Sequence, residues 1–261
     1  MNVLDFIKMK KRGEVISMVT VYDSTSAAIV QESDVDSILV GDSLAMTMHG
    51  YPSTLEASLQ MMCLHIAAVR RGAPKAFIVG DMPFLSYRKG LTRAMDAVHA
   101  IMQAGANAVK LEGIKGSQEV IAHIVNSGVP VMGHLGLVPQ SVNSLGGYRV
   151  QGKGRLQEEV LLQQSQELQE LGCFSLVLEC VPASVGNKIS QQLQIPTIGI
   201  GAGNGCDGQV LVWQDLLGMN TLFQPKFVRK YMEGASLMKE ALNSYNKDVK
   251  SRKFPSQDEE F

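Results

Sequence analysis

Residues 75–113, KAFIVGDMPFLSYRKGLTRAMDAVHAIMQAGANAVKLEG, contain one complete strand–helix–strand unit. The runs KAFIVGDMPF and NAVKLEG are apolar without strict alternation, which is typical of strands buried on both faces of a parallel sheet. Between them, residues 91–105 have helical spacing and end at a glycine, where helices commonly stop. This order predicts a β-α unit of an α/β protein.

The same unit recurs along the whole chain. Most of the short apolar runs are separated by stretches with helical spacing, and these stretches also end at a glycine. Eight such runs predict a closed (β/α)8 barrel. An open doubly wound sheet is disfavoured, because no glycine-rich phosphate loop follows the first run. The eight runs are VISMVTVYD, SILVGDS, KAFIVGDMPF, NAVKLEG, VPVMGHLG, FSLVLEC, IPTIGIGAG and QVLVWQD.

Length and composition favour one soluble domain. The 261 residues are 45% hydrophobic, enough for one large core, so we expect a single domain over 1–261. We expect an N-terminal helix at about 2–11 and a flexible polar tail at about 247–261. Lys and Arg number 24 against 25 Asp and Glu, so no field of one sign favours nucleic acid or an anionic membrane. Small-molecule partners are expected instead.

The cysteines and the hydropathy pattern predict a cytoplasmic protein. The four cysteines are scattered without a C-x-x-C pair, which argues against a disulfide framework or a structural zinc site. No stretch reaches the ~18 apolar residues that a membrane span needs, and the N-terminal stretch has no apolar h-region. We therefore expect a soluble protein of the reducing cytoplasm.

Polar and ionisable side chains end most of the predicted strands, where the active site of a parallel barrel lies. Carboxylates crowded in one layer repel one another unless a cation compensates them. Oxygen ligands without a His/Cys cluster favour Mg²⁺, with Asp42 and Asp81 as ligands and Glu112 bound directly or through water. The strand-end side chains are Tyr22, Asp23, Asp42, Ser43, Asp81, Lys110, Glu112, His134 and Glu179.

The remaining residues suggest enolate chemistry. Lys110 shares a barrel face with Glu112, so its ammonium would face a carboxylate or enolate oxygen of a bound 2-oxo acid. A Schiff-base role for Lys110 is disfavoured, because the neighbouring acids oppose it. Glu179 follows an apolar run and is suited to proton abstraction. His134 donates either to a backbone carbonyl or to the substrate, and we favour the substrate. For the aspartates, a single Asp after a strand is more often a helix cap than a metal ligand.

Nine segments resemble the ketopantoate hydroxymethyltransferase family in their order and spacing, and together they span most of the chain. Small departures from the family pattern are Ala45, Ile114 and Val138, none of which removes a charged group. The matching segments are VTVYD, LVGDSLAM, HIAAVRRGAP, GDMPFLSY, AGANAVKLEG, VPVMGHLGLVPQSVNSLGGYRVQG, LVLECVP, IPTIGIGAGNGCDGQVLVWQDLLG and PKFVRKY.

The resemblance implies a (β/α)8 barrel of the phosphoenolpyruvate/pyruvate type that binds one Mg²⁺ per subunit. It also implies transfer of a hydroxymethyl group from 5,10-methylenetetrahydrofolate to 3-methyl-2-oxobutanoate, giving ketopantoate for pantothenate and coenzyme A synthesis, through a metal-stabilised enolate. Family members are typically homodecamers. By resemblance, Asp42, Asp81 and Glu112 match the metal site, Asp42, Ser43, Asp81, Lys110 and His134 match substrate contacts, and Glu179 matches the catalytic base.

Two other functions remain open from the sequence. A C–C lyase or mutase of the phosphoenolpyruvate/isocitrate-lyase type shares the barrel, but such enzymes usually carry a catalytic cysteine in a mobile loop, for which Cys180 and Cys206 are the nearby thiols. A non-catalytic barrel that binds a 2-oxo acid would be expected to lose the carboxylates that this sequence retains.

Overall fold

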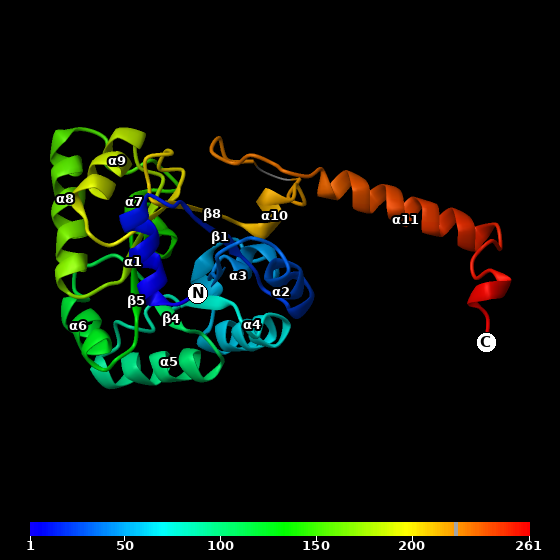
Figure 1. Cartoon of the computed structure of the whole chain (residues 1–261), viewed down its shortest axis with the longest axis horizontal. Helices are drawn as coiled ribbons and strands as arrows, with labels where there is room; N and C mark the ends of the chain where they lie inside the picture. The colour runs from blue at the N-terminus through cyan, green and yellow to red at the C-terminus, as the bar shows by residue number, and fades with distance from the viewer. Residues whose placement is uncertain (222–223) are drawn as a thin grey trace. The chain divides into compact units, whose positions relative to one another are not determined.

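All eight apolar runs form parallel strands of one closed barrel (Figure 1). Each strand pairs with the next along the chain, and β8 pairs with β1 to close the sheet. The predicted (β/α)8 barrel is therefore confirmed. The strands are β1 Ile16–Thr20, β2 Ser37–Val40, β3 Phe77–Asp81, β4 Ala108–Glu112, β5 Val131–Gly136, β6 Ser175–Glu179, β7 Thr197–Ile200 and β8 Gly208–Leu211.

The computed structural model describes residues 1–221 and 224–261, and only the backbone at Leu145. By its contacts the chain forms two compact units, Met1–Leu211 and Val212–Phe261. The single domain expected over 1–261 stays a prediction. The first unit contains the whole barrel. Within the described residues, no helix is both long and apolar enough to cross a membrane.

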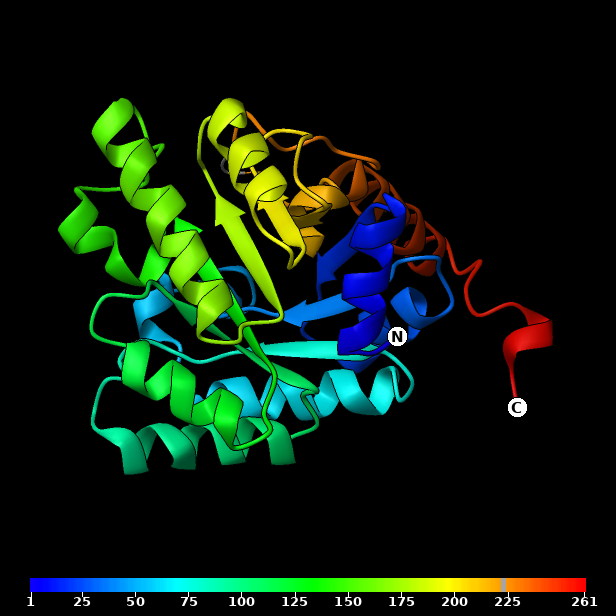
Figure 2. The same cartoon turned by 60° about the vertical axis from the view of Figure 1, so that its left-hand side comes forward.

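Helices of the first unit connect the strands around the barrel, as the turned view makes clear (Figure 2). The run TLEASLQMMCLHIAAVRRG opens with a Thr that can cap a helix, but it does not form one continuous helix. Ser58 caps α4 by accepting the N–H of Met61, and Thr54–Glu56 forms a separate turn, because the backbone at Ala57 is extended and interrupts the helix. The helices are α1 Val3–Arg12, α2 Ser24–Gln31, α3 Leu44–Thr47, η1 Thr54–Glu56, α4 Leu59–Gly72, α5 Leu91–Gln103, α6 Gln118–Asn126, η2 Pro139–Ser141, α7 Val142–Leu145, α8 Arg155–Glu170 and α9 Ala183–Gln192.

The N-terminal helix α1 covers the amino end of the barrel. Asn2 and Asp5 form a capping box at its start, and Gly13 ends it with φ of 70° in the left-handed region. Phe6 is fully buried, and its ring centroid lies 5.2 Å from that of Phe77 and 5.3 Å from that of Phe174. This aromatic cluster closes the interior where the strands begin.

The barrel interior changes from apolar to charged along the strands. Side chains two residues apart share a face of a strand, so each strand sends a series of side chains inward. In β3 the series is Phe77, Val79 and Asp81, and in β4 it runs from Ala108 through Lys110 to Glu112. The apolar members form the core cluster, whereas the charged members lie at the carboxyl end.

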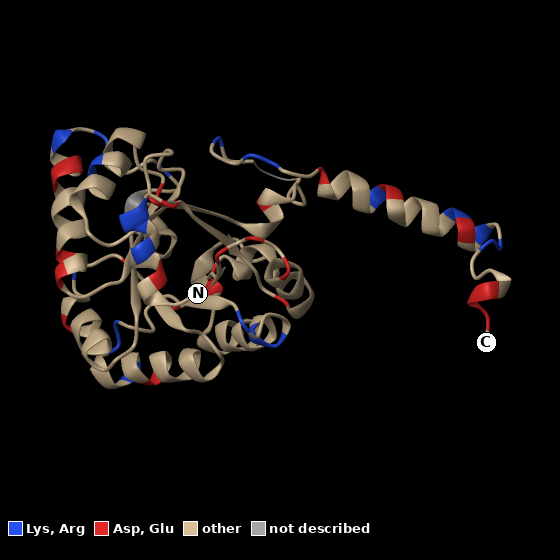
Figure 3. Cartoon of the chain, viewed as in Figure 1, with Lys and Arg blue, Asp and Glu red and all other residues tan. Residues whose placement is uncertain are grey.

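The second unit contains the rest of the chain. It holds the short helix α10 Trp213–Leu216, the long helix α11 Gly234–Lys250 and the turn η3 Gln257–Glu259. Helix α11 carries both acidic and basic residues along its length (Figure 3). It extends into the segment expected to be a polar tail from about 247, and the flexibility of that tail stays a prediction.

Candidate active site

Strand register brings the charged side chains of the barrel mouth side by side. Asp81 of β3 pairs with Lys110 of β4, and Glu112 of β4 pairs with His134 of β5. Lys110 Nζ lies 3.1 Å from Asp81 Oδ1 and 3.9 Å from Glu112 Oε1, and all three side chains are buried. The parallel pairing thus converts strand-end residues that are distant in sequence into one contiguous layer.

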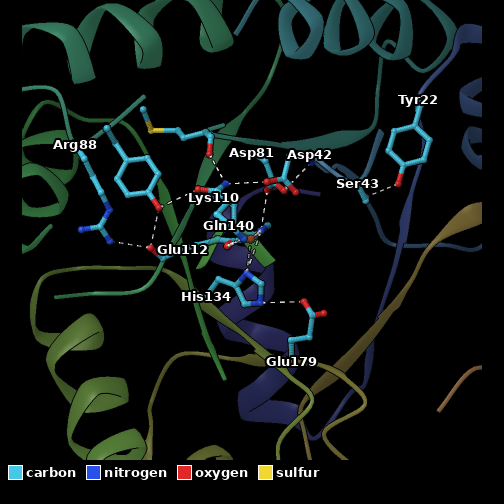
Figure 4. Close-up of polar contacts among 12 residues, drawn as sticks. Tyr22, Asp42, Ser43, Asp81, Arg88, Lys110, Glu112, His134, Gln140 and Glu179 are labelled. Carbon is cyan, nitrogen blue, oxygen red and sulfur yellow. Dashed lines mark hydrogen bonds and ion pairs between the residues drawn. The ribbon is translucent and has the colours of Figure 1, made fainter. Parts of the chain in front are cut away.

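Asp42 joins this layer from just beyond the end of β2. Its backbone N–H donates to Asp81 Oδ2 over 3.0 Å, which holds the two aspartates next to each other (Figure 4). Gly41 leaves room for this contact, because a Cβ there would lie 2.9 Å from Ser43 Oγ and 3.5 Å from Asp81 Oδ2. Burial, together with the charges of Glu112 and Asp81, raises the pKa of Asp42 well above its usual value.

Lys110 and Glu112 are stabilised in their charged forms. Burial alone would lower the pKa of Lys110, but the charges of Asp81, Glu112 and Asp42 raise it above its usual value. Burial would raise the pKa of Glu112, yet its contacts with His134 and Lys110 lower it. The contacts of the layer therefore favour the charged ammonium of Lys110 and the charged carboxylate of Glu112.

His134 connects this layer to Glu179. Its Nδ1 lies 3.4 Å from Glu112 Oε1, and its Nε2 lies 3.2 Å from Glu179 Oε2. Burial and the Lys110 charge lower the pKa of His134, but Glu112 and Glu179 outweigh them and raise it to about 9. The side chain of Glu179 is 18% exposed against 3% for Glu112, so Glu179 is the more accessible carboxylate to a molecule entering the mouth.

The remaining strand-end residues divide between two roles. Tyr22 is buried, and its hydroxyl lies 2.7 Å from Ser43 Oγ, so Ser43 is oriented from the end of β1 (Figure 4). Asp23 instead caps α2 by accepting the backbone N–H of Ser26 over 2.9 Å, which is the common fate of an aspartate after a strand. Asp23 therefore lies outside the charged layer.

Sequence reasoning missed Gln140 and Tyr87. Gln140, in η2, is buried and donates to the carboxylates of both Asp42 and Glu112, and Tyr87 OH donates to the backbone carbonyl of Glu112 over 2.8 Å. Both residues are neutral and follow a strand by several positions, so a search for ionisable strand ends did not reach them. Gln140 could have been found from its place in the segment VPVMGHLGLVPQSVNSLGGYRVQG, which resembles the family and contains this polar residue.

The charge balance of this layer suits a divalent cation. Among the described residues, Asp81, Glu112 and Glu179 make ion pairs with two basic side chains, Lys110 and His134, whereas the carboxyl group of Asp42 is bound by the neutral amide of Gln140. Asp81 Oδ1 is buried and makes no hydrogen bond, although Lys110 lies within ion-pair distance. A cation next to Asp42 and Asp81 would compensate the excess negative charge.

The described residues do not form a ready-made site of three or more His, Cys, Asp or Glu ligands. Glu112 is occupied by His134, Lys110 and the backbone N–H of Gln140. The arrangement fits Mg²⁺, which commonly takes one or two carboxylates and completes its octahedral shell with water and substrate oxygens. Asp42 and Asp81 are the side chains placed to supply those carboxylates.

Solved structures with a similar fold include enzymes of related architecture. A phosphonopyruvate hydrolase in complex with oxalate and Mg²⁺ matches with a TM-score of 0.64 and 9% identity, over 99% of this chain and 93% of that one. A 2,3-dimethylmalate lyase of the phosphoenolpyruvate mutase/isocitrate lyase superfamily matches with a TM-score of 0.62 and 13% identity, over 95% of this chain and 88% of that one. At these identities the likeness extends to the fold alone.

Sequence comparisons identify the family. The model of the family described as ketopantoate hydroxymethyltransferase matches residues 1–257. The 3-methyl-2-oxobutanoate hydroxymethyltransferase of Bdellovibrio bacteriovorus is 54% identical, over 100% of this chain and 99% of the relative. The proteins of the same name from Coxiella burnetii strain CbuG_Q212 and Legionella pneumophila strain Lens are 54% and 50% identical, covering 98% and 100% of this chain and 96% and 100% of the relatives. The chain therefore belongs to the ketopantoate hydroxymethyltransferase family of transferase enzymes.

Proposed function

We propose that this enzyme transfers a hydroxymethyl group from 5,10-methylenetetrahydrofolate to 3-methyl-2-oxobutanoate, giving ketopantoate for pantothenate and coenzyme A synthesis. The observation that carries the proposal is the layer of Asp42, Asp81, Lys110 and Glu112 at the barrel mouth, next to His134 and Glu179. Membership of the ketopantoate hydroxymethyltransferase family supports the reaction type, the two substrates are proposed from the family resemblance, and the layer offers the groups that the acceptor needs.

Glu179 is proposed to remove the proton from C3 of the oxo acid. Its side chain is the most accessible carboxylate of the barrel mouth, and His134 Nε2 lies within ion-pair distance of its Oε2, at 3.2 Å. Once C3 has lost its proton, it forms a bond to the one-carbon unit of the folate. The two bonds from this carbon to folate nitrogens are replaced by the new C–C bond and by a hydroxyl from one water molecule, the nitrogens take up protons, and tetrahydrofolate leaves. The proton on Glu179 can then pass to solvent through the exposed side of the carboxylate.

Lys110 and Ser43 are proposed to bind the oxygen atoms of the acceptor. The ammonium of Lys110 faces the mouth among carboxylates that keep it protonated, so it can stabilise negative charge that develops on the substrate. The hydroxyl of Ser43 is oriented by Tyr22 over 2.7 Å. Mg²⁺, held by Asp42 and Asp81 with Glu112 close by, would supply the additional positive charge that favours an enolate.

The oligomer and the compartment are also proposals. By family resemblance we propose a cytoplasmic homo-oligomer, with ten subunits each binding one Mg²⁺. The four cysteines are all free, which suits a reducing compartment. Light scattering of the eluting protein in size-exclusion chromatography measures the subunit number directly.

The two alternative functions have less support. Relatives that cover the whole chain at 50–54% identity carry a transferase name, whereas the lyase and mutase neighbours match the fold at 9–14% identity. Burial and the charge of Glu179 raise the pKa of the Cys180 thiol to about 11, and Cys206 is buried and packs against Gly186 and Gly199. Neither thiol is placed as an activated group in an open loop.

The test is a direct assay of product. The purified protein is incubated with Mg²⁺, 5,10-methylenetetrahydrofolate and 3-methyl-2-oxobutanoate, and ketopantoate is measured by mass spectrometry. We expect product only when all three are present. Absence of product in the complete mixture would reject the proposed reaction.

A further inference from the structure

Gln140 joins the ends of three strands through one buried side chain. Its backbone N–H donates to Glu112 Oε2 over 2.9 Å, and its Nε2 donates to Asp42 Oδ2 over 2.8 Å and to the carbonyl of Met82 over 2.9 Å. Its Oε1 accepts from Tyr87 OH over 3.2 Å. These contacts connect residues at or just beyond the ends of β2, β3 and β4 (Figure 4).

The orientation of the Gln140 amide follows from its partners. Asp42 Oδ2 and the Met82 carbonyl are both acceptors, so the amide nitrogen has to face them, and the oxygen is left to accept from Tyr87. Both N–H groups of the amide are therefore used, and the amide oxygen lies 3.2 Å from the Tyr87 hydroxyl, whose single proton is shared with the carbonyl of Glu112 at 2.8 Å. The two N–H contacts fix the orientation of the amide, which makes it an effective support for its partners.

Gln140 hydrogen-bonds to only one of the two carboxylate oxygens of Asp42. Gln140 binds Oδ2, and among the described residues no side chain or backbone group hydrogen-bonds to Asp42 Oδ1. The amide thereby sets the rotation of the carboxylate group. Asp42 would present the same oxygen to a cation in every molecule, at the position next to Asp81 that its own N–H secures.

We propose that Gln140 is a positioning residue that orients Asp42 for binding the divalent cation and ties this aspartate to Glu112. The inference rests on the proposed function, since it concerns the cation that the transferase reaction uses. Hydrogen-bond partners of metal ligands commonly contribute 10–100-fold to metal affinity, because they hold each ligand in its binding geometry. Gln140 serves two carboxylates of the layer at once.

Gln140→Met tests the proposal with a side chain of similar length. Methionine removes both amide donors but keeps the backbone N–H that binds Glu112, so the loss is confined to the contacts of the side chain. We expect the affinity of the substrate-free protein for Mn²⁺, measured by calorimetry, to fall about ten-fold. We also expect the Mg²⁺ concentration for half-maximal activity to rise by a similar factor.

Thr197→Val provides a matched control at the other end of the barrel. Thr197 is buried, and its hydroxyl bonds to Asp207 Oδ2 over 2.9 Å and lies 2.6 Å from Ser190 Oγ. This substitution also removes buried hydrogen bonds, so it reproduces a general loss of stability. The Mn²⁺ affinity of Thr197→Val should equal that of the unsubstituted protein, even if its thermal unfolding midpoint is lower.

The outcomes separate the two proposals. If the unsubstituted protein does not bind Mn²⁺, the metal site of the proposed function fails, and the role of Gln140 fails with it. If the unsubstituted protein and Gln140→Met bind Mn²⁺ within two-fold of each other, the role of Gln140 alone is overturned. If the methionine variant does not fold, Gln140→Asn replaces it, because the amide of asparagine is one carbon too short to reach Asp42. An Mn²⁺ affinity of Gln140→Asn equal to that of the unsubstituted protein would overturn the proposal in the same way.

Discussion

The two ends of the barrel bury charged groups in opposite ways. At the amino end, Lys10 Nζ lies 2.8 Å from Asp207 Oδ2 and donates to the carbonyls of Ser190 and Ile195, and Asp207 also accepts from the N–H and hydroxyl of Thr197. One cation therefore meets one carboxylate, and both are satisfied by further donors and acceptors. At the carboxyl end, three carboxyl groups share two basic side chains, and a fourth, on Asp42, has the neutral amide of Gln140 as its side-chain partner.

This difference separates stability from function within one fold. The Lys10–Asp207 ion pair and the aromatic cluster around Phe6 lower the free energy of the folded chain, so the amino end contributes mainly to stability. Carboxylates in excess at the carboxyl end oppose folding until a cation or substrate neutralises them. Substitutions at the two ends should consequently change different measured quantities.

Glu179→Gln should give the largest effect, and it should fall on catalysis alone. The amide cannot accept a proton, and loss of a general base typically costs 10²–10⁴-fold, so we expect turnover to fall roughly 10³-fold. The thermal midpoint should stay unchanged or rise, because one carboxylate is removed from a crowded layer. The decisive measurement is deuterium exchange at C3 of 3-methyl-2-oxobutanoate in D₂O; exchange at the unsubstituted rate would show that Glu179 is not the base.

Phe6→Ala should give the opposite result at the amino end. Removing a fully buried phenyl ring from the cluster with Phe77 and Phe174 costs about 3–5 kcal/mol of unfolding free energy, through lost burial and the cavity left behind. Urea unfolding measures this loss, and kcat per folded molecule should not change. Phe6→Leu, which fills most of the cavity, is the control and should cost less. A lower kcat in the folded Phe6→Ala protein would contradict the separation of the two ends.

The barrel and most of its charged layer could be predicted because one periodicity governs both. Strands buried on both faces leave continuous apolar runs, and the last inward position of each run lies at the mouth. Asp81, Lys110, Glu112 and His134 are such positions, and the structure brings them together. Their chemical roles stay predictions, since proximity does not by itself assign a function.

The contacts made by loops could not be predicted in the same way. Gln140 reaches Asp42 only because η2 folds back over the end of β4, and this path depends on several loop residues with no periodic pattern. The start of α4 could not be predicted for a similar reason, since both Thr54 and Ser58 can cap a helix and the backbone of Ala57 decides between them. Local propensity does not resolve such choices.

Mg²⁺ should stabilise the folded protein through the carboxyl end. A ligand that binds only the folded state at 100 times its Kd contributes about 2.7 kcal/mol, and the unfolding free energy should rise by this order when Mg²⁺ is added. Asp81→Asn should lose most of this gain. An equal Mg²⁺-dependent gain in both proteins would exclude Asp81 as a ligand.

Lys10→Met should give the smallest effect, a loss of about 1–2 kcal/mol of unfolding free energy without any change in kcat. The loss is limited because Asp207 keeps its two donors from Thr197, and the apolar stem of methionine can replace that of lysine. Lys8→Met is the control on the same helix: Lys8 is exposed and its partner Asp5 is partly exposed, so this change should cost less than Lys10→Met. A fall in kcat for Lys10→Met with unchanged stability would mean that charge at the amino end acts on the active site, and the two ends could no longer be treated as independent.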